Sequence, residues 1–296
     1  MKIIDCFMYY DEDNLLDLRL NILNKYVDKF IIVESKFTHS GNLKNKNFDI
    51  ENFKEFKNKI DYYFIENEPL NLKKIDKNDT LEVKNNKRIF NGLLRDNFQR
   101  ENLNQGIKKL NDEDFIIISD LDEIPNLENI NLENLKKKIL VFEQKMFYYK
   151  LNLLYPRLKW FGSKICQKKY LVSPQWLRNI KAKKYPFWRL DTLFSNKKYQ
   201  NLKIIPNGGW HFTNMKNAKD LHRKMNNFAH HPEYEDTKYS EEDMANFIKK
   251  KLVFYDHFSD KNKNRFESVN QLEKVNESYL PNYLVENYEK YKSLID

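Results

Sequence analysis

Phe115-Ile116-Ile117-Ile118-Ser119-Asp120-Leu121-Asp122-Glu123-Ile124-Pro125 is the stretch that decides the fold of this 296-residue chain. Its first four residues form a short, unbroken apolar run, which is typical of a strand covered on both faces of a sheet. Residues i and i+2 that leave a strand face the same side, so the carboxylates of Asp120 and Asp122 are expected to point together. Two such carboxylates repel each other unless a cation or hydrogen-bond donors lie beside them. A hard divalent ion that also binds phosphate oxygens is a natural partner.

The same residues allow a second interpretation. A strand could be followed by the N-terminus of an acidic helix, where Asp and Glu simply complement the helix dipole. Pro125 is expected to end the strand and to start a helix or a loop. Asp-x-Asp is a common pattern, but its position after a buried strand near the middle of the chain favours the metal site.

Strands and helices alternate on the N-terminal side of this stretch. Apolar runs predict strands at 3–9, 30–33 and 62–65, and helical spacing of apolar residues predicts helices at 14–24 and, as one long helix, at 88–110. A polar helix is expected around 50–59. This order predicts an α/β fold with a mostly parallel central sheet flanked by helices. Ligands of such sheets bind beyond the carboxyl ends of the strands. The polar clusters after Tyr9, at 34–41 and at 120–123 are therefore expected to converge on one active-site edge.

The pattern changes from about Val141 to aromatic, Pro-punctuated segments that predict shorter, mixed strands and loops. Helices are expected near 218–228, 241–251 and 281–294. The chain contains no Gly/Ser-rich linker and no internal repeat. We therefore expect one main domain at 1–216 and a helical C-terminal extension at 217–296 that packs on it.

Composition excludes some classes of protein. A hydrophobic fraction of 41% argues against global disorder, although 32% of residues are charged. The formal charge is +9, but the lysines are scattered, which favours a solvated surface over a nucleic-acid interface. Cys6 and Cys166 are expected to be buried free thiols, as in a reducing compartment. No signal peptide and no apolar run of membrane-spanning length are visible, so we expect a cytoplasmic protein that is at most peripheral to a membrane.

Several stretches together resemble glycosyltransferase family 17, which includes the bisecting N-acetylglucosaminyltransferases. The resemblance rests on the order and spacing of the matching stretches, from near the start to about residue 230. They are Asp5-Cys6-Phe7 with Glu12, Leu18-Arg19 leading to Val27-Asp28, Val33-Glu34 with Thr38-His39-Ser40-Gly41, Arg95-Asp96-Asn97-Phe98-Gln99-Arg100, Ser119 to Pro125, and Gly208-Gly209-Trp210-His211-Phe212.

This resemblance implies an inverting enzyme with a GT-A-type nucleotide-sugar-binding fold. It also implies UDP-N-acetylglucosamine as the donor and a divalent metal, Mn²⁺ or Mg²⁺, as the cofactor. We expect the protein to depart from the animal members of the family, as a shorter chain without their N-terminal membrane anchor and stem. Their acceptor, a branched N-glycan core mannose, is therefore not carried over, and the expected acceptor is a glycan, glycolipid or glycoprotein.

The resemblance also implies roles for individual residues. Asp120 is expected at the ribose or sugar side of the donor and Asp122 at the metal. His211 is expected as a further metal ligand or a diphosphate contact, with a core histidine between two aromatic residues as the alternative.

Three further residues are predicted to bind the donor. Glu34 follows a buried strand, where a carboxylate either binds a nucleoside or orients the loop. Arg100, on the helix before the Asp120 strand, either pairs with phosphate or with a motif carboxylate. Lys224 could cover the diphosphate, although solvated lysines are the commoner outcome.

An inverting transfer needs a general base for the acceptor hydroxyl, usually Asp or Glu. Glu123, Glu143 and Asp191 are the candidates. Large aromatic side chains either stack on sugar faces or fill the core. Those considered for sugar contact are Tyr148, Trp160, Trp176 and Trp188.

Two other functions remain open from the residues alone. A haloacid-dehalogenase-like phosphatase also places Asp-x-Asp after a strand, but it requires its nucleophilic Asp early in the chain with a small hydroxyl residue soon after. A non-catalytic protein that binds nucleotide sugars or carbohydrates would not need the acidic pair together with His211.

Overall fold

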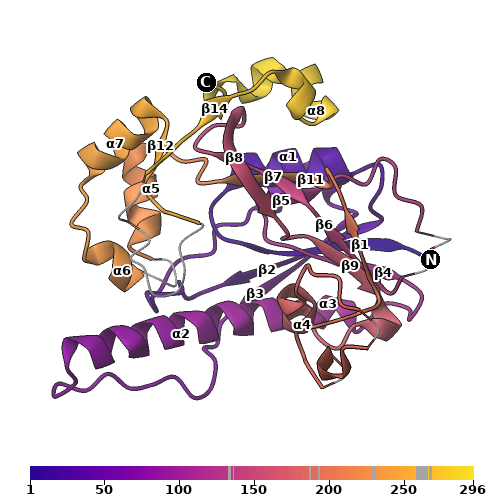
Figure 1. The fold of residues 1–296 in the computed structure, drawn as a ribbon, viewed down its shortest axis with the longest axis horizontal. Coiled ribbons are helices and arrows are strands. Elements are labelled where there is room, and N and C mark those ends of the chain that lie inside the picture. The colour runs from indigo at the N-terminus through magenta and orange to yellow at the C-terminus, as the bar shows by residue number, and fades with distance from the viewer. Residues whose placement is uncertain are drawn as a thin grey trace.

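The computed structural model describes residues 1–132, 135, 137–186, 188–192, 194–227, 231–257, 266 and 269–296. Its centre is a seven-stranded sheet in the order β10-β6-β9-β4-β1-β2-β3 (Figure 1). The strands of this sheet are β1 (Ile3–Tyr9), β2 (Lys29–Ser35), β3 (Ile60–Ile65), β4 (Phe115–Ile118), β6 (Ile139–Phe142), β9 (Lys164–Gln167) and β10 (Leu202–Ile205).

Most neighbouring strands of this sheet are parallel. β1 pairs in parallel with β2 and β4, β2 with β3, and β10 with β6, whereas β9 runs antiparallel to both β4 and β6. The strands predicted at 3–9, 30–33, 62–65 and 115–118 all form. The predicted α/β class with a mostly parallel sheet is therefore confirmed.

The four apolar residues of β4 show why their run is unbroken. All four are at most 1% exposed. Phe115 and Ile117 lie in one hydrophobic cluster, whereas Ile116 and Ile118 lie in another. Successive side chains of a strand point to opposite faces, so β4 contributes to two cores at once. Both faces of β4 are therefore apolar up to its end at Ile118.

Helices flank the central sheet. The helix predicted at 14–24 is α1 (Asp13–Leu23), and the one predicted at 50–59 is a 3₁₀ helix at Ile50–Phe56 with a kink at Phe53. The remaining helices of the first two thirds of the chain are α2 (Leu81–Glu101), α3 (Asn104–Ile107) and α4 (Pro174–Asn179), with 3₁₀ turns at Lys168–Tyr170 and Leu190–Thr192.

The prediction of one long helix at 88–110 is wrong, because the helix begins earlier and is broken after Glu101. The helix α2 begins at Leu81, where the side chain of Thr80 accepts a hydrogen bond from the amide of Val83. It ends at Glu101, and the side-chain Nδ2 of Asn102 donates to the carbonyl of Phe98 at 2.8 Å. A side-chain donor that satisfies a last-turn carbonyl competes with continued helix. The chain then turns into the short α3.

Directly after the acidic pair, the chain enters a second sheet of five strands. Its order is β14-β8-β7-β11-β5. Its strands are β5 (Glu123–Pro125), β7 (Gln144–Tyr148), β8 (Leu153–Trp160), β11 (Gly209–Thr213) and β14 (Glu273–Lys274). The residues after Asp122 therefore enter a new strand. The alternative of an acidic helix N-terminus at this place does not match this path. Pro125 is the last residue of β5 and a loop follows it, as expected, although the strand that it ends is β5 and not β4.

The C-terminal region combines helices with short strands. Its helices are α5 (Ala218–Met225), α6 (His231–Glu235), α7 (Glu241–Lys250) and α8 (Asn282–Glu286), with 3₁₀ helices at Glu277–Tyr279 and Tyr288–Leu294. Its strands β12 (Leu252–Val253) and β13 (Asn270–Gln271) pair with each other, and β14 pairs with β8. The helix expected at 281–294 is thus broken at Asn287. The expected end of the 218–228 helix, Phe228, lies outside the described residues.

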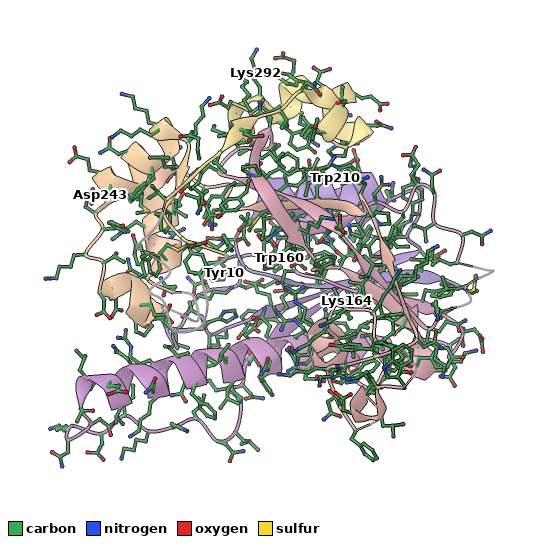
Figure 2. The ribbon with its side chains drawn as sticks, in the orientation of Figure 1. Tyr10, Trp160, Lys164, Trp210, Asp243 and Lys292 are labelled. Carbon is green, nitrogen blue, oxygen red and sulfur yellow. The ribbon has the colours of Figure 1, made fainter. Side chains whose placement is uncertain are left out.

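Side chains from both halves of the chain meet in the middle of the molecule. Figure 2 shows Tyr10, Trp160 and Lys164 near its centre, whereas Asp243 and Lys292 lie at its rim. Cys6 and Cys166 are buried free thiols, as expected. Burial raises the pKa of the Cys166 thiol to about 12. No helix among the described residues is both long and apolar enough to cross a membrane.

Candidate active site

A cavity of about 220 Å³ lies beyond the carboxyl ends of β1, β2 and β4. The three polar clusters that were expected to converge, after Tyr9, at 34–41 and at 120–123, all contribute to it, and Lys224 of α5 and Asn227 just beyond that helix are added to them. The lining residues are Met8, Tyr9, Tyr10, Glu12, Ser35, Phe37, Thr38, His39, Lys44, Gln99, Asp120, Leu121, Asp122, Lys224 and Asn227. Parallel strands gather their ligands at this edge of a sheet, so the cavity is the candidate active site.

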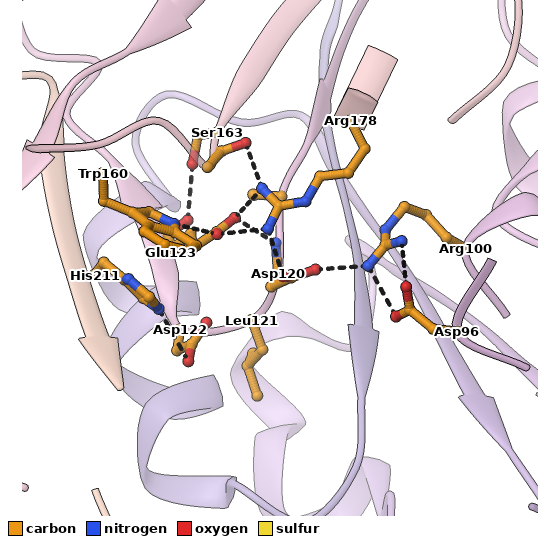
Figure 3. Close-up of polar contacts among 12 residues, drawn as sticks. Asp96, Arg100, Asp120, Leu121, Asp122, Glu123, Trp160, Ser163, Arg178 and His211 are labelled. Atoms are coloured by element: carbon orange, nitrogen blue, oxygen red, sulfur yellow. Dashed lines mark hydrogen bonds and ion pairs between the residues drawn. The ribbon is translucent and has the colours of Figure 1, made fainter. Parts of the chain in front are cut away.

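Two arginines hold the carboxylate of Asp120. Nη2 of Arg178 donates to Oδ2 at 2.7 Å, and Nη2 of Arg100 donates to Oδ1 at 3.0 Å (Figure 3). Burial raises the pKa of Asp120, but the guanidinium groups of Arg178 and Arg100 outweigh it and hold that pKa well below its usual range. Asp120 is therefore a fixed, ionised carboxylate, and its side chain stays 33% exposed toward the cavity.

The prediction for Arg100 is thereby resolved in favour of a motif carboxylate. Its guanidinium also pairs with Asp96, one helical turn earlier, and contacts the side-chain oxygen of Gln175 at 2.5 Å. Arg100 is 3% exposed and is not among the residues that line the cavity. It acts on the site through Asp120.

Glu123 is fully buried and lies behind the cavity. Its two oxygens accept hydrogen bonds from both Nη atoms of Arg178 at 2.8 and 2.9 Å. They also accept from the indole of Trp160 at 2.5 Å and from the backbone amide of Asp120 at 2.8 Å. A carboxylate with its acceptor sites filled and no exposure cannot reach an acceptor hydroxyl. This geometry argues against the predicted role of Glu123 as general base and gives it a positioning role.

The buried guanidinium of Arg19 shapes the turn that carries the acidic pair. Nη1 donates to the carbonyls of Asp120, Leu121 and Glu123 at 3.0, 3.1 and 2.8 Å. Nε and Nη2 form a pair with Asp5, and both side chains are 0% exposed. One arginine thus satisfies three carbonyls that a buried turn would otherwise leave unpaired.

Asp122 lies beside His211. The strand β11 runs antiparallel to β5, places His211 opposite Glu123, and lets the amide of Phe212 donate to the carbonyl of Asp122 at 2.8 Å. As a result, Nε2 of His211 lies 3.4 Å from Oδ2 of Asp122. Burial raises the pKa of Asp122, but the nearby His211 and Lys224 lower it below its usual value.

The ring of His211 is held by stacking. Its centroid lies 4.7 Å from that of Trp160, with 29° between the planes. Its Nδ1 is buried and has no hydrogen-bond partner within the described part of the chain. The stacking on Trp160 is typical of a core histidine, whereas the contact with Asp122 is typical of a metal ligand. His211 has both features.

The residues at this point are compatible with a divalent metal. Among the described residues, no group of three or more His, Cys, Asp and Glu side chains is arranged to hold one. Mg²⁺-type ions are nevertheless usually bound through one or two carboxylates, substrate phosphates and water, not by an all-protein cage. Asp122 supplies the carboxylate and His211 lies next to it. The donor set fits a metal that shares its coordination with a diphosphate.

Lys224 lines the cavity, as predicted, whereas Glu34 does not. The carboxylate of Glu34 is 0% exposed and contacts Lys44. It also accepts hydrogen bonds from the amides of Asn47 and Phe48 at 2.8 and 3.1 Å and from the hydroxyl of Tyr62 at 2.7 Å. Glu34 therefore orients the loop that carries Lys44 into the cavity. Because its side chain is fully buried and does not line the cavity, Glu34 is not placed to contact the donor directly, although such contact was expected.

The other two candidates for the general base lie outside the cavity lining. Glu143 pairs with Lys159 at 3.1 Å. Asp191 is exposed and pairs with Arg189 at 2.7 Å and Lys198 at 2.6 Å.

Of the four aromatic residues considered for sugar contact, one lies at the site. Tyr148 is 2% exposed and belongs to the core, and Trp176 packs edge-on against Tyr199. Trp160 lies at the site beside His211, whereas Trp188 is 66% exposed.

Arg178 is a residue of the site that sequence reasoning missed. It lies in the last turn of the short helix α4, and no local pattern connects it with a motif more than fifty residues earlier. Arg19 left a weak signal, because it interrupts the apolar face of a predicted helix between Leu18 and Ile22. A charged residue at such a position is buried only when it is paired.

Comparison with known families assigns the chain to a family of enzymes. The sequence model of glycosyltransferase family 17 matches residues 1–296, the whole chain. No curated protein matched the sequence. A match over the whole length includes every strand end that forms the cavity, together with Asp120, Asp122 and His211. The chain belongs to glycosyltransferase family 17 and is a glycosyltransferase.

Proposed function

We propose that this glycosyltransferase is an inverting, metal-assisted enzyme with a GT-A-type fold that transfers N-acetylglucosamine from UDP-N-acetylglucosamine to a glycan acceptor. The observation that supports this most directly is the exit of Asp120 and Asp122 from β4 into one cavity at the sheet edge, with Asp122 beside His211. The family assignment sets aside the phosphatase and the non-catalytic binding protein as alternatives.

The donor would lie across the ends of β1, β2 and β4. Tyr10 and Phe37 offer flat surfaces for a base, and Thr38 offers a hydroxyl. Asp120, ionised and held by Arg178 and Arg100, would accept hydrogen bonds from donor hydroxyls without having to reorient.

Asp122 and His211 would hold the metal, Mn²⁺ or Mg²⁺. When bound, such an ion neutralises the charge that develops on the departing diphosphate. Lys224 is the cation of α5 in the cavity lining, and it would contact the diphosphate from the side opposite to the sheet. Its Nζ lies 3.8 Å from Oε1 of Glu12, another residue of the cavity lining.

Glu12 is the carboxylate that we assign to proton removal. Of the three acids that line the cavity, Asp120 is held by two arginines at 2.7 and 3.0 Å and Asp122 lies beside His211, whereas Lys224 and Lys216 lie 3.8 and 3.9 Å from Glu12. Glu12 also lines a second cavity of about 650 Å³, where an acceptor has room to bind. It would accept the proton of the acceptor hydroxyl while that oxygen attacks the anomeric carbon and the nucleoside diphosphate leaves.

The remaining expectations belong to the same proposal. The GT-A-type domain would comprise residues 1–216, with 217–296 as an extension packed on it. The enzyme would act in the cytoplasm on a glycan, glycolipid or glycoprotein, without a nucleic-acid partner.

A binding experiment followed by a donor screen tests the proposal. Isothermal titration with UDP should show an affinity that increases when Mn²⁺ is added, and this increase should disappear in Asp122→Asn. Release of UDP should then be measured with UDP-N-acetylglucosamine, UDP-galactose, GDP-mannose and dTDP-glucose. Turnover of a GDP- or dTDP-sugar in preference to the UDP-sugars would overturn the donor, and metal-independent UDP binding would overturn the role of Asp122.

A further inference from the structure

The segment that follows α4 forms a closed loop with an exposed apolar centre. The amide of Lys181 donates to the carbonyl of Lys197 at 2.8 Å, which joins the two ends of the loop. Between them, Trp188 is 66% exposed, Leu190 67% and Phe194 90%. Large apolar side chains gathered on one exposed segment usually mark a binding surface. In Figure 1 the chain after α4 lies at the lower edge of the molecule.

Hydrogen bonds within the loop hold its backbone in place. Nε2 of Gln200 donates to Oγ1 of Thr192 at 2.7 Å and to the carbonyls of Pro186 and Arg189, both at 3.3 Å. Oγ1 of Thr192 donates to the carbonyl of Arg189 at 2.7 Å, and Thr192 is only 7% exposed. The hydroxyl of Thr192 and the carbonyls of Pro186 and Arg189 are thus hydrogen-bonded within this segment, whereas Trp188, Leu190 and Phe194 are exposed.

The ends of the loop are strongly basic. Residues 181–198 contain six Lys and Arg and one acid, Asp191. That acid is already paired with Arg189 and Lys198. The other four cations are exposed, and they lie toward the two ends of the loop, on either side of the apolar centre. They are Lys181, Lys183, Lys184 and Lys197.

We propose that this loop docks the enzyme on an anionic phospholipid bilayer. An apolar centre with Trp and Phe, flanked by lysines, matches the order of a bilayer surface, in which acyl chains lie beneath anionic headgroups. Aromatic residues with flanking cations can also bind nucleic acid, but Leu190 has no aromatic face on which a base could stack. The arrangement therefore favours a lipid surface.

The position of the loop relates docking to the reaction. Lys181 follows Arg178 by three residues, and Arg178 contacts Asp120 in the active site. A loop held at the bilayer would thus place the site close to an acceptor carried by a lipid. This surface goes beyond the proposed function, and it stands even if another donor or another base is found.

Vesicle co-sedimentation of the full chain tests the proposal. We expect binding to vesicles of phosphatidylcholine with about one third phosphatidylglycerol to exceed binding to pure phosphatidylcholine by about tenfold, and to fall in about 0.5 M NaCl. The triple variant Trp188→Ser, Leu190→Ser, Phe194→Ser should lose about tenfold in binding, and so should Lys181→Gln, Lys183→Gln, Lys184→Gln.

Leu70→Ser is the matched control, because Leu70 is 85% exposed but lies outside the loop. It should bind vesicles like the unchanged chain, and thermal unfolding should show that all variants remain folded. Equal binding to neutral and anionic vesicles, or equal loss in the Leu70 variant, would overturn the proposal. So would poly(U) binding that the Trp188, Leu190 and Phe194 changes abolish while vesicle binding persists.

Discussion

Arg178 and Asp120 are 58 residues apart in the chain, and Nη2 of the one lies 2.7 Å from Oδ2 of the other. The same guanidinium also engages both oxygens of Glu123 and the carbonyl of Gly162 at 2.8 Å. One residue from α4 thus fixes the first Asp of the motif and the Glu that follows it (Figure 3). It leaves Asp122 to face His211.

Loss of this arginine should cost stability as well as activity. Arg178→Met leaves Glu123, which is 0% exposed, without its cation. Removing one partner of a buried ion pair costs about 3–5 kcal/mol of unfolding free energy. Urea unfolding measures this loss. Arg189→Met is the control, because its exposed pair with Asp191 should contribute less than about 1 kcal/mol. Equal losses in both variants would contradict the buried-clamp interpretation.

Asp122 should be needed for turnover but not for folding. Its side chain lies at the strand exit and is 21% exposed, so Asp122→Asn should keep the unfolding temperature within a few degrees. Metal-dependent UDP release should fall by about 10²–10³, which is the usual effect of losing one group that stabilises transition-state charge. Asp191→Asn, which changes an exposed acid outside the cavity, should retain its activity. Full activity in Asp122→Asn would remove the metal from the mechanism.

Glu12 should affect the chemical step more than donor binding. Glu12→Gln keeps the shape of the side chain but cannot take up a proton, so transfer should slow by about 10²–10⁴. The affinity for UDP with Mn²⁺, measured by titration, should change little, because Asp122, His211 and Lys224 remain. A large loss of UDP affinity together with normal turnover at saturating donor would instead make Glu12 a donor-binding residue.

Gly162 should tolerate no side chain. A Cβ at this position would lie 2.0 Å from Cδ of Glu123 and 2.2 Å from its Oε1. Gly162→Ala must therefore displace the carboxylate from Arg178. Overpacking of this kind costs about 1–3 kcal/mol. Chemical unfolding gives the loss, and a crystal structure of the variant should show Glu123 moved. An unperturbed Glu123 in that structure would refute the tight contact.

Lys164 should make stability depend on pH. Burial, with a smaller effect from Arg178, lowers the pKa of Lys164 to about 7 in the folded chain, compared with about 10.4 when unfolded. Between these values the unfolded chain binds more protons, so the free energy of unfolding rises with pH, by at most about 1.4 kcal/mol per unit. Lys164→Met removes this contribution.

The comparison of the two proteins isolates the effect. The stability of Lys164→Met relative to the unchanged chain should be highest near pH 7 and should decrease toward pH 9, as measured by urea midpoints in a pH series. A difference that is constant across this range would show that Lys164 keeps its ordinary pKa.

The sequence by itself determined the strands that build the cavity and the acids that enter it. The apolar runs of β1, β2 and β4 are local patterns, because each buried strand contributes side chains to both faces of the sheet. Since the carboxyl ends of parallel strands share one edge, the convergence of the segments after Tyr9, Glu34 and Ile118 also followed from order alone.

Only the tertiary structure decided which charged groups meet there. Arg178 reaches Asp120 because β9 and α4 return the chain to β4, and His211 reaches Asp122 because β11 pairs with β5. Contacts between distant parts of the chain also bury Glu123 and Glu34, which the sequence predicted to contact substrate. Burial and ion pairing of a carboxylate depend on residues far away in the chain, so no local spacing could have distinguished the positioning acids from those that face the donor.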